Sequence, residues 1–170
     1  DFHLNVAGEY VYDGALYACQ SDDAKQRRSK RAVWGRAAIL TVAVAAGGCI
    51  PAPGMQNCFY VLLPYLGEFL GAASVIWALA KLGTDWSTVR EYNYKKSVAV
   101  LPVRTAVTAV FSLLGIVCEL IFFFVNDHAG QTFFALLYVL LKLIALLSVL
   151  VLRAEIMQAE WDKLPKKNNF

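Results

Sequence analysis

Four ionisable side chains interrupt the long apolar stretches of this sequence and are its strongest candidates for chemistry. They are Glu68, Arg104, Glu119 and Lys142. A charge at the centre of a bilayer costs from about 3 to more than 10 kcal/mol unless it is paired or hydrated. Glu68 and Lys142 lie at the same depth, roughly 15 Å from one face of a membrane at the helical rise per residue. We therefore expect these two side chains to form an ion pair near the midplane.

Helical periodicity places further polar residues beside these charges. At about 100° per residue, one arc of about 80° is shared by Arg104, Thr108, Ser112, Gly115 and Glu119. On the last apolar stretch Tyr138 shares a face with Lys142, and on the second Gly67-x-x-x-Gly71 permits close approach of another helix. These stripes predict an intramembrane polar network inside a helix bundle: Glu68, Arg104, Thr108, Ser112, Glu119, Tyr138 and Lys142.

Two interpretations of this network are open. Two acids and two bases are formally neutral together, which favours a structural network that fixes helix register. Intramembrane ionisable residues also mark transport pathways. In that case Glu68, Glu119, Lys142 and Arg104 line the cavity of a small transporter or of a ligand-binding membrane protein.

The sequence carries no recognisable catalytic motif. We find no metal-ligand spacing, nucleophile elbow, phosphate-binding loop or paired catalytic carboxylates, so we expect no enzyme, no metal and no cofactor. Cys49 and Cys58 bracket a short connection, where they form either a disulfide or two inert thiols. A thiol oxidoreductase would need a closely spaced Cys-x-x-Cys pair, which the chain lacks.

Composition identifies the elements that must hold these residues. Hydrophobic residues make up 58% of the 170 residues and charged residues only 17%, and the mean hydropathy is +0.50. Four stretches, about 33–53, 58–82, 98–125 and 132–153, are each long enough to cross a bilayer as a helix. They form a transmembrane domain over 32–153, and they exclude a secreted mini-protein, a Rossmann enzyme and a nucleic-acid module.

The distribution of basic residues predicts the topology. None of the 16 Lys and Arg lies in the connections 54–57 and 126–131. By the positive-inside rule, both termini and the connection between the second and third spans face the cytoplasm of a multi-pass cell-membrane protein. The basic cluster at 25–31 then lies beside anionic lipids, so we expect the lipid bilayer as a partner and no nucleic acid.

The segment at 1–31 precedes the first span and contains a candidate β-hairpin at 9–18. Asp13-Gly14 between β-forming residues is a strong signal for a two-residue turn. That turn would pair Val11 with Leu16 and Tyr10 with Tyr17, and would place Tyr12 on the same face. The alternative is a juxtamembrane tail whose tyrosines rest in the headgroup layer.

Two other segments outside the spans have helical signals. The connection 83–97 predicts a short interfacial helix with Thr84 and Asp85 as caps, and its aromatic residues form an interface belt. In 154–170, Met157, Trp161 and Leu164 continue a helical stripe, which predicts that the fourth helix runs to Leu164. The candidate partner face comprises Tyr10, Tyr12, Tyr17, Met157, Trp161 and Leu164.

Together these features predict an all-α four-transmembrane-helix bundle with a short N-terminal cytoplasmic β-hairpin. We expect a non-enzymatic accessory or self-assembling subunit with a buried charge network, acting with a membrane-protein partner or as a homo-oligomer. Gly67 and Gly71 serve either dimerisation or helix packing within the chain. The small transporter or ligand-binding membrane protein remains the alternative.

Overall fold

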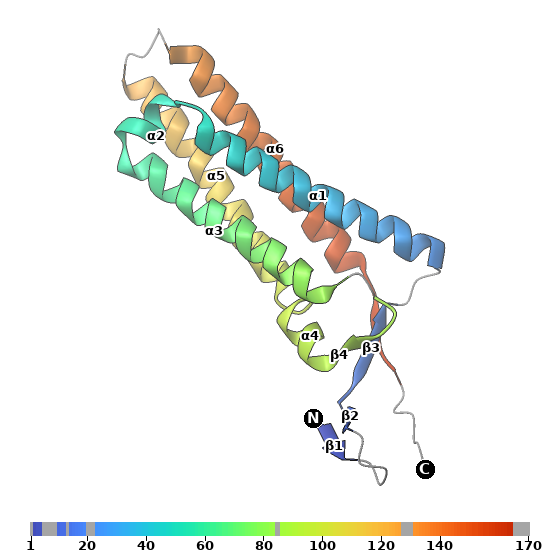
Figure 1. Ribbon diagram of the computed structural model, residues 1–170. Helices are drawn as coiled ribbons and strands as arrows, with labels where there is room; N and C mark the ends of the chain where they lie inside the picture. The colour runs from blue at the N-terminus through green and yellow to red at the C-terminus, as the bar shows by residue number, and fades with distance from the viewer. Residues whose placement is uncertain are drawn as a thin grey trace.

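Four long antiparallel helices form the body of the protein (Figure 1). The computed structural model describes residues 2–4, 10–12, 14–19, 23–83, 86–126 and 131–164. The helices are α1 (Asp23–Cys49), α3 (Phe59–Leu82), α5 (Leu101–Val125) and α6 (Thr132–Gln158). All four are long and apolar enough to cross a membrane, which confirms the predicted spans. The first helix begins ten residues earlier than the predicted span, because the basic cluster at 25–31 is itself helical.

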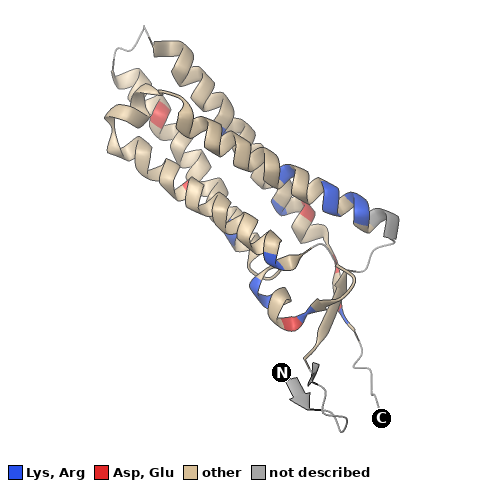
Figure 2. Ribbon diagram, viewed as in Figure 1, with Lys and Arg blue, Asp and Glu red and all other residues tan. Residues whose placement is uncertain are grey.

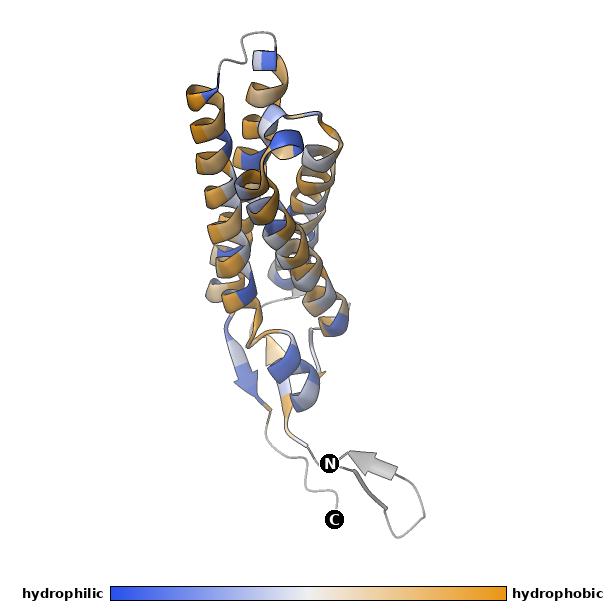
Figure 3. Ribbon diagram, turned by 90° about the vertical axis from the view of Figure 1, so that its left-hand side faces the viewer, coloured by the Kyte–Doolittle hydropathy of each residue, from blue (hydrophilic) through white to orange (hydrophobic). Residues whose placement is uncertain are grey.

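The outer surface of the bundle is apolar, as a bilayer requires. Large side chains such as Val42, Leu70, Trp77 and Leu113 are more than half exposed, and much of the ribbon of each long helix has the orange of hydrophobic residues in Figure 3. The interior holds an apolar core, with residues such as Leu40, Val75 and Leu79, together with buried polar and charged groups. An apolar outer surface around such an interior is compatible with a membrane protein.

Small residues set the close approach of the helices. A Cβ atom at Gly67 would overlap the Phe111 ring, and one at Gly71 would overlap the Thr108 hydroxyl, both on α5. The Gly67-x-x-x-Gly71 motif therefore packs α3 against α5 within one chain. Gly48, near the end of α1, leaves room in the same way for the Tyr65 hydroxyl.

A short helix closes one end of the bundle, which we call the α2 end. After α1 the chain turns through α2 (Pro53–Asn57), which contacts α3, α5 and α6. A proline at its first position suits the start of a helix, where the missing N–H would have no helical partner. Pro53 and Gly54 are buried, so α2 folds back onto the bundle axis.

A three-stranded antiparallel sheet lies at the opposite end, which we call the sheet end (Figure 1). Its order is β4 (Val89–Arg90), β3 (Leu16–Cys19) and β5 (Trp161–Lys163). The prediction that the fourth helix reaches Leu164 is therefore wrong, because α6 ends at Gln158 and Ala159 is extended. Backbone hydrogen bonds to β3 replace the helical ones that residues 161–164 would have made.

The predicted hairpin at 9–18 is also wrong. The strand β2 (Tyr10–Tyr12) pairs with β1 (Phe2–Leu4), and β3 pairs on both sides with β4 and β5. The expected Val11 to Leu16 and Tyr10 to Tyr17 pairs do not form, and Asp13 lies outside the described residues. An isolated hairpin is marginally stable, whereas β3 in the sheet gains two partners and joins a sheet that packs on the bundle.

The connection between α3 and α5 contains the predicted short helix, α4 (Glu91–Lys96). It starts after β4, and the expected caps Thr84 and Asp85 lie outside the described residues. Trp86 is only 4% exposed, so this indole belongs to the packed interior of the sheet end and not to an interface belt.

Candidate functional site

The centre of the bundle holds a buried ion pair. Lys142 Nζ on α6 contacts Glu68 Oε2 on α3, as their equal depth predicted. Both side chains are almost completely buried, at 2% and 0% exposure. The ammonium group also lies 4.6 Å from the centre of the Tyr65 ring and 5.2 Å from that of Tyr138. Two aromatic faces thus add cation–π stabilisation to the ion pair.

Small residues on α5 make room for this pair. A Cβ atom at Gly115 would lie 3.6 Å from Lys142 Cε, which is van der Waals contact with the aliphatic part of the side chain. One turn along α5, the Ser112 hydroxyl donates a hydrogen bond of 3.3 Å to the Lys142 carbonyl oxygen. The predicted polar face of the third span therefore does point into the bundle.

Towards the sheet end, polar groups find partners in helix carbonyls. Thr108 Oγ1 donates to the Arg104 carbonyl oxygen at 2.8 Å, and Arg104 donates to the Ser74 carbonyl oxygen at 2.7 Å. Arg153 donates to the Pro102 carbonyl oxygen. Arg104 thus shares the predicted face, but among the described residues it pairs with no acid of the network.

Towards the α2 end, Glu119 lies in a different environment. Its side chain is fully buried, and its Oε1 accepts a hydrogen bond of 3.4 Å from the Gly54 backbone N–H. A Cβ atom at position 54 would overlap the carboxylate, so a larger residue there would force the Glu119 side chain to move. Among the described residues, no basic side chain forms an ion pair with Glu119.

Three buried oxygens at and beyond the ion pair have no hydrogen-bond partner among the described residues. They are Glu68 Oε1, Glu119 Oε2 and the Tyr138 hydroxyl. Tyr138 precedes Lys142 by one turn of α6, and Glu119 follows Gly115 by one turn of α5. Because the two helices are antiparallel, both steps run towards the α2 end by about 6 Å. Tyr138 and Glu119 therefore lie at about the same depth, one turn from the ion pair on its α2 side.

The four cysteines are free thiols in the structure. Cys49 is exposed and Cys58 is partly buried, and they are not joined. The sequence left two alternatives for Cys49 and Cys58, a disulfide or two thiols, and the structure has two thiols.

Members of the predicted partner face have separate environments at the sheet end. Tyr17 stacks on Tyr94 with ring centres 4.2 Å apart, and Trp161 packs against Tyr94 and Trp86. Met157 is 63% exposed, and the Leu164 N–H donates to the Leu16 carbonyl oxygen. The side chains of Tyr10 and Tyr12 lie outside the described part of the chain.

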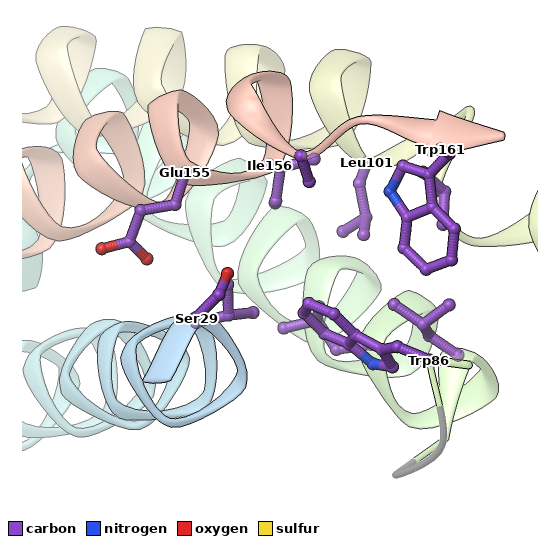
Figure 4. A pocket seen from close by; sticks show the side chains of 11 residues that line it. Ser29, Trp86, Leu101, Glu155, Ile156 and Trp161 are labelled. Atoms are coloured by element: carbon purple, nitrogen blue, oxygen red, sulfur yellow. The ribbon is translucent and has the colours of Figure 1, made fainter. Parts of the chain in front are cut away.

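A mainly apolar cleft separates α1, α3 and α6 near the sheet end (Figure 4). Ser29 and Glu155 face each other across one part of it, and Trp86 and Trp161 line the other part. Glu155 Oε1 lies 3.9 Å from Arg36 Nε on α1. The sequence patterns did not identify this cleft, because its lining comes from segments far apart in the chain.

No known family model, curated protein or solved structure matches the chain. Interpretation of the site therefore rests on its own geometry.

Proposed function

We propose that the protein is a non-enzymatic membrane subunit whose bundle is fixed by the Glu68–Lys142 pair and whose sheet binds an extended segment of a partner protein. The observation that carries this proposal is the position of β5 at the edge of the sheet. An edge strand presents unpaired N–H and C=O groups to which another strand can add.

The register of β5 identifies the groups available to a partner. The Leu164 N–H bonds to the Leu16 carbonyl oxygen at 2.8 Å, so it points into the sheet. Backbone N–H directions alternate along a strand. The Asp162 N–H therefore also points towards β3, and the Lys163 N–H points away from the sheet. The outer edge at Lys163 is therefore the proposed binding edge.

Charge supports a cytoplasmic position for this edge. Lys and Arg gather along the bundle towards the sheet end, as the blue segments of Figure 2 show. Under the positive-inside rule this end faces the cytoplasm, together with both termini. The chain then offers its sheet to cytoplasmic segments of other membrane proteins.

The Glu68–Lys142 pair supports a structural role for the spans. It is neutral, buried and enclosed by the Tyr65 and Tyr138 rings. A pair of this kind fixes the register of α3 against α6, because any slip would leave a charge alone in hydrocarbon.

Gentle detergent extraction of the tagged full-length protein from its host tests the docking proposal. We expect a stoichiometric partner with the wild type and its loss with Lys163→Pro, which removes the outward N–H and no hydrogen bond within the sheet. The matched control is Lys163→Thr, which changes the same side chain and keeps the N–H, so it should retain the partner. A wild-type monomer or homo-oligomer, or retention of the partner by Lys163→Pro, would contradict docking at this edge.

A small transporter remains a second candidate because of the three unpartnered oxygens near the α2 end. Arg104 lies outside that group, since its guanidinium bonds to Ser74. A flux in liposomes that disappears with Glu119→Gln would favour this candidate over the partner-binding subunit.

A further inference from the structure

We propose that Glu119 is a buried proton-binding site that is reached from the α2 end. This inference does not rest on partner binding at the sheet, because it concerns the opposite end of the bundle. It starts from the protonation state that a fully buried carboxyl group can hold.

Glu119 has little to stabilise a negative charge. Among the described residues its one hydrogen bond, from the Gly54 N–H, is long at 3.4 Å, and no basic side chain pairs with it. An isolated carboxylate in an apolar interior is so costly that the group takes up a proton instead. The neutral carboxyl then becomes a donor as well as an acceptor.

Within the described ranges, the neighbours of Glu119 supply further polar groups but no cation. Tyr60 from α3 and Tyr138 from α6 lie within electrostatic range of the carboxyl, and Cys118 is adjacent in α5. Gly54 from α2 contributes only its backbone. These side chains are neutral at ordinary pH, and the charged groups of the described part of the bundle centre are the internally compensated Glu68–Lys142 pair.

The unpartnered oxygens point to a hydrated chain around this carboxyl. Glu119 Oε2, the Tyr138 hydroxyl and Glu68 Oε1 are buried and have no partner in the described part of the chain. Buried polar atoms of this kind are ordinarily satisfied by internal water. Water there would hydrogen-bond to Glu119 and to the Tyr138 hydroxyl on the α2 side of the ion pair.

Size and ligand type exclude larger occupants. A single added carbon at position 54 would already overlap the Glu119 carboxylate. No group of three or more His, Cys, Asp or Glu residues within the described ranges is arranged to hold a metal ion. The acidic character of the group disfavours an anion, so the proton is the ligand that this site fits.

The α2 helix provides the route to the surface. Gly54 contacts Glu119, while the neighbouring residues Gln56 and Asn57 of the same helix are exposed. A displacement of this single turn would open the carboxyl to the aqueous phase. On the other side, the hydroxyl and guanidinium groups of α5 bond to helix carbonyls.

Infrared spectroscopy of the full-length protein in lipid nanodiscs tests the protonation. At neutral pH we expect a carboxyl C=O band that shifts in D₂O and is lost in Glu119→Gln. Glu155→Gln, which alters a partly exposed carboxylate at the sheet end, is the matched control and keeps the band. Tyr138→Phe also keeps the band but shifts it, so the test does not depend on one variant. Absence of the band in the folded wild type, or its persistence in folded Glu119→Gln, would overturn the proposal.

A one-sided pH jump tests the route. In sealed vesicles sorted for one orientation by a tag at the sheet end, raising the pH on the α2 side should remove the band. Raising it on the sheet side should leave the band unchanged. The opposite response, or an equal response from both sides, would contradict access through α2.

Discussion

The two halves of the bundle axis satisfy their polar groups in different ways. On the sheet side of the ion pair, the α5 residues Thr108, Arg104 and Ser112 each donate to a helix carbonyl oxygen. On the α2 side, the Tyr138 hydroxyl and Glu119 Oε2 have no partner among the described residues. Away from α5, the sheet end also has buried polar atoms without a partner among these residues: Trp86 Nε1, Ser97 Oγ and Glu155 Oε2. Both halves are buried, so burial alone does not explain the difference.

This contrast separates two uses of polar residues in a membrane interior. Groups that bond to a carbonyl fix the helices and leave nothing available for exchange. Groups without a protein partner cost free energy unless water or a proton satisfies them, so along α5 they mark the α2 side of the ion pair, where Glu119 lies, as the place in which proton exchange is possible. The Glu68–Lys142 pair lies at the boundary, and Glu68 Oε1 has no partner among the described residues.

Breaking the ion pair should have the largest effect. Lys142→Met leaves Glu68 buried without its cation and should lower the free energy of unfolding by about 3–5 kcal/mol. Glu68→Gln should also destabilise the protein, and the double variant should recover part of the loss. Denaturant unfolding in detergent measures this, and strictly additive losses would show that the two side chains do not interact.

Crowding the α2 end should have the next largest effect. Gly54→Ala forces a methyl group against the Glu119 carboxyl and should cost about 1–3 kcal/mol. Glu119→Ala should relieve that cost when the two changes are combined. Gly35→Ala is the matched control, because no atom lies within 4 Å of its added Cβ, and it should be neutral or stabilising. If Gly54→Ala and Gly35→Ala lowered the free energy of unfolding equally, the contact between Gly54 and Glu119 would not explain the loss.

Hydroxyl deletions compare the two halves directly. Ser112→Ala removes a hydrogen bond to the Lys142 carbonyl oxygen and should cost about 1 kcal/mol. Tyr138→Phe removes a hydroxyl without a protein partner and should change stability by less than about 0.5 kcal/mol. The comparison fails if Tyr138→Phe proves the more damaging of the two in the same unfolding assay.

A pH effect at the sheet end should be the smallest. The Lys95 ammonium, 2.7 Å from Glu91, and the Ala15 N–H hold the pKa of Glu91 below its ordinary value of 4.5. The ionised form is therefore favoured in the fold, and its contribution is present above pH 4.5 and lost as the pH falls through the lowered pKa. Stability of Glu91→Gln should depend less on pH over that range; an unchanged slope would contradict the assignment.

The sequence predicted those features that depend on one helix or on depth in the membrane. Apolar length identified the four spans, and equal depth paired Glu68 with Lys142. The spacing of Gly67 and Gly71 predicted the close approach of another helix, for dimerisation or for packing within the chain. In the structure the two glycines pack against α5 of the same chain. These signals are local or one-dimensional, so a single sequence is enough to carry them.

The sequence analysis missed the features that depend on contacts between segments far apart in the chain. Met157, Trp161 and Leu164 fit a helical stripe, yet pairing with β3 outweighs that local preference. Asp13-Gly14 favoured a local hairpin, but β3 pairs instead with segments more than 70 residues away. The contact of Gly54 with Glu119 has no sequence signal, because it exists only after α2 folds back over α5.

Water accessibility along the axis tests most directly the claim that the two halves differ. Radiolytic hydroxyl labelling of the native protein, read by mass spectrometry, modifies buried side chains only where bound water is adjacent. We predict strong labelling of Tyr138, which is 0% exposed, and weak labelling of the equally buried Leu101 and Leu152 near the sheet end. After correction for intrinsic reactivity, equally weak labelling at both ends would contradict a hydrated, proton-binding α2 half.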